Sequence, residues 1–183
     1  VYSKMNVQNS TIINDIYKSR KQILQFLSIQ GFDTSQHESF TISEINAMKQ
    51  AVNQNNTNER NQLDFELAHA EDESKRCSVV YYLKTTIKKA VLQEIVSEYY
   101  DFDEDKRKKC NIIVVILGNI NDTVINSVKE LWEKYNEHCT VFDISSLQYN
   151  ILEHDFVPKH EKISEEEKSK IFEKYHIKNE TQL

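Results

Sequence analysis

The chain has 183 residues, a length typical of one ordinary domain or of one domain with an appendage. Its 23 basic and 29 acidic residues give a formal net charge of −6. This balance argues against a protein that coats nucleic acid by itself, because such binding rests on a net basic surface. No apolar run approaches the roughly 18 residues that a membrane helix needs, and residues 1–5 show no signal-peptide core.

Two helices are predicted near the N-terminus. Apolar residues recur at spacings of three and four through residues 10–31, and Gly31 is a plausible C′ residue that ends this helix. A second helix is expected from a cap at Ser43 to about Val52. The asparagine-rich segment 53–61 then predicts a loop, because it has no core-forming residues.

After this loop the pattern changes to that of strands. Apolar residues alternate with polar ones in 63–68, and 78–84 is predicted to pair with this strand as a hairpin. The continuous apolar and largely β-branched run 112–117 is typical of a strand buried on both faces. A last core strand is expected at 140–144.

Helices are predicted between these strands. The first would be capped by Thr85 or Thr86, and the second by Asp122 or Thr123. The resulting order of β-β-α-β-α-β predicts an α/β fold in which helices cover a mixed sheet. The boundary with a separate C-terminal piece is expected near residues 149–153.

The C-terminal piece opens with His-Asp-Phe-Val-Pro-Lys-His at 154–160, which holds the only proline of the chain and two of its six histidines. Pro158 fixes its own φ and pushes Val157 toward an extended conformation. Ser164 then predicts a helix start, with Glu167 at the reciprocal position of a capping box. An apolar stripe follows on one face of this helix, at Ile171, Phe172 and Tyr175. The pattern indicates a small docking element.

No metal or cofactor is expected. Three separated cysteines, Cys77, Cys110 and Cys139, show no Cys-x-x-Cys spacing and predict reduced thiols in an intracellular protein. None of the histidines completes the spacing of a zinc site. A glycine-rich phosphate loop is excluded, since the only glycines are Gly31 and Gly118.

A hairpin followed by a helix and parallel strands also allows a metal-dependent nuclease. Such a site needs an acid near the hairpin, which Asp64 or Glu66 could supply, and an acid-x-Lys on the next strand. The sequence has Tyr82 where that second acid should stand before Lys84. A missing carboxylate would leave the metal under-coordinated, so a solvated charged face is the favoured interpretation.

Two features could touch nucleic acid. The loop 118–123 opens a predicted helix, whose N-terminus could hold a backbone phosphate. The lysine-rich cluster 106–109 could add positive charge. Both have ordinary explanations, because Asp122 is a common N-cap that repels phosphate and acidic residues at 101–105 balance the lysines.

The segment 153–183 resembles the assembly domain of the fifth subunit of eukaryotic and archaeal-type RNA polymerases, in its Pro-Lys-His and Ser-x-x-Glu-Lys motifs. Looser similarity covers nearly the whole chain. It includes Arg20 and Lys21 in the first helix, the close of that helix at 30–32, and the strand and acidic-Ser turn within 63–74.

The resemblance implies an N-terminal jaw domain at 1–150, with a nuclease-like α/β fold that lacks a nuclease site. It also implies an assembly domain at 151–183 that docks on the largest polymerase subunit. The family continues past the equivalent of Leu183, so this domain is expected to be cut short. The residues expected at the contact are His154, Phe156, Val157, Pro158, Lys159, His160 and Tyr175.

In this family the jaw lies beside downstream double-stranded DNA. The DNA-facing positions would be Asn119, Asn121, Asp122 and Thr123. The family's Thr-Pro-Ser at the helix start has become Asn-Asp-Thr here, so only a weak contact within the complex is expected. The implied function is that of a non-catalytic polymerase subunit, nuclear if the source is a cell, or in a virus factory or virion if it is a large DNA virus. The alternatives are a nuclease or resolvase-type enzyme and a free-standing protein-interaction adaptor.

Overall fold

The structure is a computed structural model in which the chain divides into two compact units, Val1–Tyr149 and Asn150–Leu183. The described residues are 2–54, 61–72, 74–99, 109–135, 138–158 and 163–177. No helix among them is both long enough and apolar enough to cross a membrane. The assignment of the two units as jaw and assembly domains stays a prediction.

The first unit is built on one mixed sheet of four strands in the order β1-β2-β3-β4. Strand β1 (Phe65–Ala68) pairs antiparallel with β2 (Lys75–Tyr82), which runs parallel to β3 (Lys109–Ile116). Strand β4 (His138–Asp143) pairs parallel with β3 and ends the sheet. The predicted α/β class and mixed sheet are confirmed, although the strand bounds differ by a few residues.

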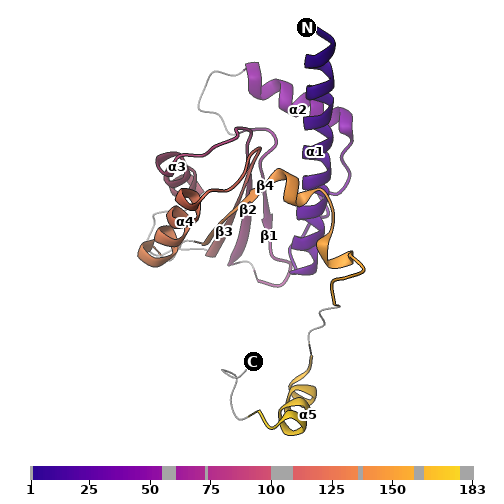
Figure 1. Ribbon diagram of the computed structural model, residues 1–183, viewed down its shortest axis with the longest axis vertical. Helices are drawn as coiled ribbons and strands as arrows, with labels where there is room; N and C mark the ends of the chain where they lie inside the picture. Colours follow the sequence, from indigo (N-terminus) through magenta and orange to yellow (C-terminus); the bar gives the residue numbers. More distant parts are fainter. Residues whose placement is uncertain are drawn as a thin grey trace. The chain divides into compact units, whose positions relative to one another are not determined.

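Helices cover the two faces of this sheet (Figure 1). Helices α3 (Lys89–Tyr99) and α4 (Asp122–Tyr135) lie on one face, because each connects two parallel neighbouring strands. Helices α1 (Tyr2–Ile29) and α2 (Ile42–Gln54) belong to the core of the other face.

Strand β3 lies at the centre of the core, as its sequence predicts. Its residues alternate between two apolar clusters, one beneath each layer of helices. Ile112, Val114 and Ile116 belong to the cluster with α3 and α4, whereas Ile113 and Val115 belong to the cluster with α1. The continuous apolar run is therefore buried on both faces.

Helix α1 ends as the sequence predicts, at a glycine. Gly31 has a φ of 91°, and the Phe32 and Gly31 N–H groups donate to the carbonyls of Leu27 and Ser28, each at 3.0 Å. These two bonds form a Schellman motif, which needs a left-handed residue at the C′ position. A Cβ added to Gly31 would also lie 2.7 Å from Nε2 of His69.

The predicted helix starts need four corrections. Helix α1 begins at Tyr2 instead of near residue 10. Helix α2 is capped by Thr41 instead of Ser43: the Thr41 Oγ1 accepts from the Glu44 N–H at 3.2 Å, and the Glu44 carboxylate accepts from the Thr41 N–H at 2.6 Å. This reciprocal pairing is possible at Thr41 because Glu44 stands three residues later. Hydrogen bonds from Thr41 accordingly lower the pKa of Glu44.

The starts of the next two helices also differ. Helix α3 begins at Lys89, after the predicted caps Thr85 and Thr86, and residues 86–88 have no regular secondary structure. Helix α4 is capped by Asn121, whose Oδ1 accepts from the Val124 N–H at 3.0 Å, instead of by Asp122 or Thr123.

A buried arginine connects helix α1 to the sheet. Arg20 is only 4% exposed, and its Nη1 donates to the carbonyl of Leu63 at 2.7 Å. Its guanidinium carbon lies 4.1 Å from the ring centroid of Phe65 and 5.3 Å from that of Phe40. Burial lowers the pKa of Arg20, while Tyr81 and Asp64 act in the opposite direction. Arg20, one of the residues that carry the looser resemblance in the first helix, thus has a structural role in this fold.

We expect Arg20→Ala to lower the free energy of unfolding by roughly 2–4 kcal/mol, because it removes the ring contacts and leaves a buried carbonyl unsatisfied. Lys21→Ala is the matched control, since Lys21 is exposed on the same helix. Urea unfolding followed by circular dichroism measures both. Equal losses in the two variants would show that Arg20 does not hold α1 to the sheet.

The three cysteines are buried and free in the structure. Burial, together with the neighbouring Cys110, raises the pKa of Cys77 from its ordinary value of 9.0 to about 12. The native thiol therefore stays protonated at pH values where the unfolded thiol ionises.

Ionisation of Cys77 should not affect the free energy of unfolding below pH 9.0. Above this pH we expect the free energy of unfolding to fall as pH rises toward about 12. In Cys77→Ala this part of the alkaline slope should disappear. Denaturant unfolding at a series of pH values tests this. An identical slope in both proteins would contradict the assignment, whatever the stability lost to the cavity at neutral pH.

Candidate functional site

The first candidate surface is the edge of the sheet where β2 and β3 end. The loops that follow these strands are joined by a hydrogen bond from the Leu117 N–H to the Lys84 carbonyl at 3.0 Å. A Cβ added to Gly118 would lie 2.2 Å from the carbonyl oxygen of Thr85. Glycine is required here by the close approach of two backbones, and the loop that carries the predicted DNA-facing residues is thereby fixed in place.

The four predicted DNA-facing residues lie together at this edge, and all are exposed. Asn121 uses its side-chain oxygen to cap α4, while Asp122 places a carboxylate in the first helical turn. An acid at a helix N-terminus occupies the position that a phosphate would favour. The geometry therefore allows a few neutral hydrogen bonds from Asn119 and Thr123 and no strong anion site.

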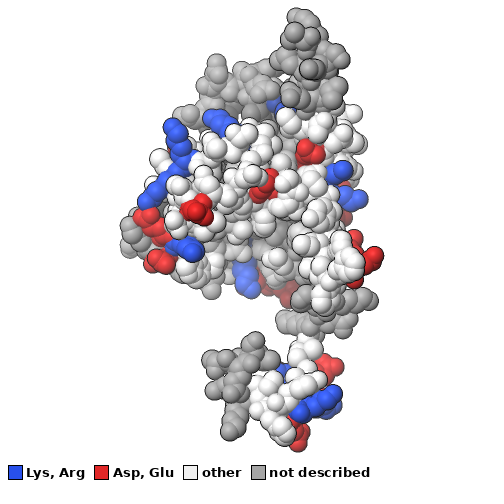
Figure 2. Space-filling model, in the orientation of Figure 1, with Lys and Arg blue, Asp and Glu red and all other residues white. Residues whose placement is uncertain are grey.

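Charge around this edge is mixed. Figure 2 shows Lys and Arg side chains interspersed with Asp and Glu on the described part of the face drawn. Lys84 is exposed on the neighbouring loop, with its ammonium 5.3 Å from the ring centroid of Tyr82. The predicted lysine cluster 106–109 lies outside the described residues except for Lys109, which begins β3.

Asp64, one of the two acids considered for a nuclease site, has a structural role. Oδ1 of Asp64 accepts from the Tyr81 N–H at 2.8 Å. This bond holds the residue just before β1 against β2. Tyr82 occupies the position where a second acid would be needed. Within the described ranges, no group of three or more His, Cys, Asp and Glu side chains is placed to hold a metal ion.

The second candidate surface is the C-terminal unit, which starts with the short helix η3 (Ile151–Glu153). Asn150 caps this turn, and the chain then folds back on His154: the Val157 N–H donates to the His154 carbonyl at 2.9 Å. The Phe156 N–H donates to Nδ1 of His154 at 3.3 Å, and the two rings lie 5.5 Å apart. The rings of His154 and Phe156 therefore lie close together, while their role in a partner contact stays a prediction.

Large apolar side chains of this unit are exposed to solvent. Phe156 is 91% exposed and Tyr175 64% exposed, Pro158 is exposed, and Val157 is partly covered. Further exposed apolar residues of the same unit are Ile151, Leu152 and Ile163. Lys159 and His160 lie outside the described residues, so their predicted contact role stays a prediction.

Helix α5 (Glu165–Tyr175) has the predicted start. The Glu167 N–H donates to Oγ of Ser164 at 3.3 Å, and the Glu167 carboxylate accepts from the Ser164 N–H at 3.0 Å, which completes the capping box. Hydrogen bonds from Ser164 lower the pKa of Glu167. At the other end His176 adopts a left-handed conformation with a φ of 54°. None of the α5 side chains is buried.

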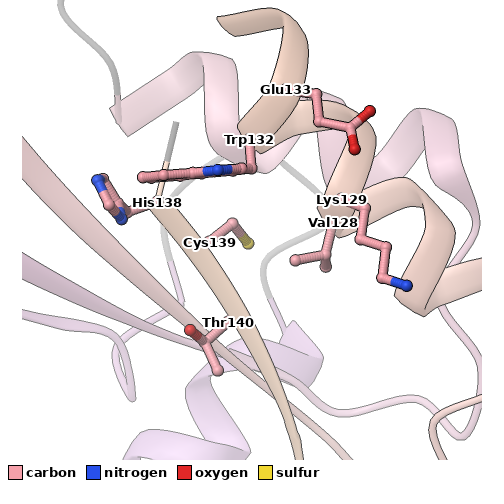
Figure 3. A pocket seen from close by; sticks show the side chains of 7 residues that line it. All are labelled: Val128, Lys129, Trp132, Glu133, His138, Cys139 and Thr140. Atoms are coloured by element: carbon pink, nitrogen blue, oxygen red, sulfur yellow. The ribbon is translucent and has the colours of Figure 1, made fainter. Parts of the chain in front are cut away.

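Sequence reasoning missed several exposed apolar residues. Ile151 and Leu152 lie just before the motif at 154–160. Their closeness to this motif could have indicated that they belong to the same exposed surface. Trp132 on α4 (Figure 3) is 48% exposed, although large aromatic side chains usually lie in the core. The helical period of a sequence identifies which residues share a face of the helix. It does not show whether the sheet extends far enough to cover all of them.

Two comparisons relate the chain to known proteins. Residues 149–183 match the protein family described as RNA polymerase Rpb5, C-terminal domain. The C-terminal unit therefore carries a domain of the Rpb5 type.

Over 161 residues the chain is 20% identical to DNA-directed RNA polymerase V subunit 5A of Arabidopsis thaliana, in a match that covers 88% of this chain and 67% of the relative. The resemblance to the fifth subunit of RNA polymerases is thus confirmed as a distant one, while a viral source stays a prediction.

We expect Gly118→Ala to destabilise the first unit by about 1–3 kcal/mol, because the added methyl group collides with the Thr85 backbone. Asn119→Ala, at the adjacent exposed position, should change stability by no more than about 0.5 kcal/mol. Thermal unfolding compares the two variants. A Gly118→Ala protein as stable as Asn119→Ala would contradict the close packing of the two loops.

Proposed function

We propose that this protein is a non-catalytic subunit of a multisubunit DNA-directed RNA polymerase and acts in transcription. The observation that carries this proposal is a C-terminal segment of the Rpb5 type whose large apolar side chains are exposed. The distant similarity to a polymerase V subunit over most of the chain supports it. In a cellular source the site of action would be the nucleus.

The C-terminal segment would dock on the largest polymerase subunit. None of its described apolar residues is buried, and Ile151, Leu152, Phe156, Ile163 and Tyr175 are exposed. Burying one large apolar side chain contributes about 1.5–3 kcal/mol. Phe156 and its neighbours in the segment His154 to Pro158 therefore supply the anchor of the proposed contact, together with Tyr175 on α5.

The first unit would act as a jaw near downstream DNA, with the loop at Asn119 to Thr123 facing the duplex. The fixed position of this loop supports a positioning role, and the exposed asparagine and threonine side chains can donate hydrogen bonds to phosphate. Because Asp122 lies among them, this contact would be weak and would depend on the rest of the complex.

The proposal is tested by co-purification of the full chain with the polymerase. We expect the double variant Phe156→Ala with Pro158→Ala to lower recovery of the largest subunit by about tenfold or more, as for loss of a central aromatic anchor. Ile29→Ala is the matched control, because Ile29 is 71% exposed but lies on α1. Unchanged recovery with the double variant would contradict docking through this segment.

Fractionation of a native extract by size separates this function from a free-standing adaptor. A polymerase subunit should migrate with a very large complex that contains the largest subunit. Migration at the size of the isolated chain, with other proteins bound, would favour the adaptor.

A further inference from the structure

His154 uses all but one of its polar groups within its own turn. Its N–H donates to the Ile151 carbonyl at 3.3 Å, and its carbonyl accepts from the Val157 N–H at 2.9 Å. The ring nitrogen Nδ1 accepts from the Phe156 N–H at 3.3 Å. The remaining group, Nε2, has no hydrogen bond to any residue that the structure describes, and His154 is exposed.

The bond at Nδ1 assigns the tautomer of this imidazole. In a neutral histidine one ring nitrogen carries the proton and the other accepts a hydrogen bond. Because Nδ1 of His154 accepts from a backbone N–H, its Nε2 carries the proton and can only donate. His154 therefore presents one unused hydrogen-bond donor, on a ring that the turn holds in place.

A second histidine has the same local bond in a different setting. Nδ1 of His69 accepts from the Glu71 N–H at 3.2 Å, again two residues later. Its ring, however, lies against its own unit, because a Cβ added to Gly31 would be 2.7 Å from Nε2 and the ring of Phe32 packs edge-on at 5.4 Å. The imidazole of His69 is thus part of the fold, whereas that of His154 is exposed.

The donor of His154 lies beside an exposed aromatic ring. The rings of His154 and Phe156 are 5.5 Å apart, and Phe156 is 91% exposed. A partner that buries Phe156 would therefore also remove His154 from water. A buried donor without an acceptor lowers affinity about tenfold, so the partner has to supply an acceptor for Nε2.

The charges next to His154 favour a neutral acceptor. Glu153 precedes it and Asp155 follows it, and both residues are exposed. These two carboxylates would repel an acidic side chain of the partner. A carbonyl oxygen, from the backbone or from an amide side chain, can accept from Nε2 without this repulsion.

We propose that the Nε2–H of His154 donates to a carbonyl oxygen beside the partner pocket that receives the Phe156 ring. This role rests on the proposed docking of the segment on the largest polymerase subunit. It makes His154 a determinant of specificity, because a surface that could hold the ring but lacks the acceptor would leave a buried donor unpaired. Phe156 supplies apolar affinity, and His154 selects the surface that receives it.

Two substitutions separate the donor from the turn. In His154→Asn the side-chain oxygen can accept from the Phe156 N–H, as Oδ1 of Asn150 accepts from the Leu152 N–H at 3.0 Å. The shorter amide has no donor at the position of Nε2. His154→Gln keeps a donor at about the reach of Nε2 and loses the acceptor for the backbone.

The measurement is recovery of the largest subunit when the full chain is co-purified with the polymerase. We expect His154→Asn to lower this recovery about tenfold and His154→Gln to lower it less. His69→Asn is the matched control, because it makes the same change at the same kind of bond in the first unit and should leave recovery unchanged. Nitrogen NMR of the free chain should find the His154 proton on Nε2.

The role of Nε2 is overturned if His154→Asn is recovered like the wild type, if His154→Gln loses as much as His154→Asn, or if the ring proton lies on Nδ1. A loss in His154→Asn that disappears at high salt would overturn the carbonyl in favour of a carboxylate acceptor. None of these results touches the proposed docking. Docking itself fails, and the role of Nε2 with it, if the wild-type chain does not co-purify with the largest subunit.

Discussion

The fold depends on a cation held in the apolar layer between α1 and the sheet. Arg20 satisfies a carbonyl of the segment that leads into β1, while its planar group lies against two aromatic rings. Its Nε has no hydrogen-bond partner in the structure, which is an uncompensated cost of burial. Close by, the hydroxyl groups of Ser19 and Tyr81 lie 3.2 Å apart, so α1 is also joined to β2. These polar contacts fix the register of a long helix on an otherwise apolar face.

Side-chain hydrogen bonds also hold the segment that leads into β1 against β2. Asn61 donates from Nδ2 to the Tyr81 carbonyl at 3.0 Å, and its Oδ1 accepts from the Leu63 N–H at 3.0 Å. Asp64 accepts from the Tyr81 N–H. The carboxylate that would serve a nuclease thus completes the backbone hydrogen bonding around Tyr81. Burial raises the pKa of this phenol, which remains neutral within the polar cluster.

Features set by local sequence could be predicted, and features set by distant contacts could not. The left-handed Gly31 and the capping box of Ser164 depend on residues within one or two turns, so the sequence identified both. The choice of Asn121 over Asp122 as a cap depends on how the chain leaves β3, which is fixed by the meeting of Gly118 with Thr85. The burial of Arg20 depends on a partner 43 residues away.

The candidate surfaces also differ in whether local sequence or distant contacts determine them. The motif at 154–160 was recognisable because its composition is unusual within the chain, and the structure adds the ring contact between His154 and Phe156. The exposure of Trp132 could not be read from a helical period, since it results from the sheet ending at β4.

Helix α5 has a defined beginning and end although it buries none of its side chains. The hydrogen bond from the Ile177 N–H to the Phe172 carbonyl at 2.9 Å closes its last turn, just as Ser164 and Glu167 close the first. Its length is therefore set by its own sequence, and the angular spacing of Ile171, Phe172 and Tyr175 exists before any partner arrives. In the docking proposed above, recognition through α5 would require less ordering of the backbone, which would favour fast and reversible attachment over slow folding on a surface.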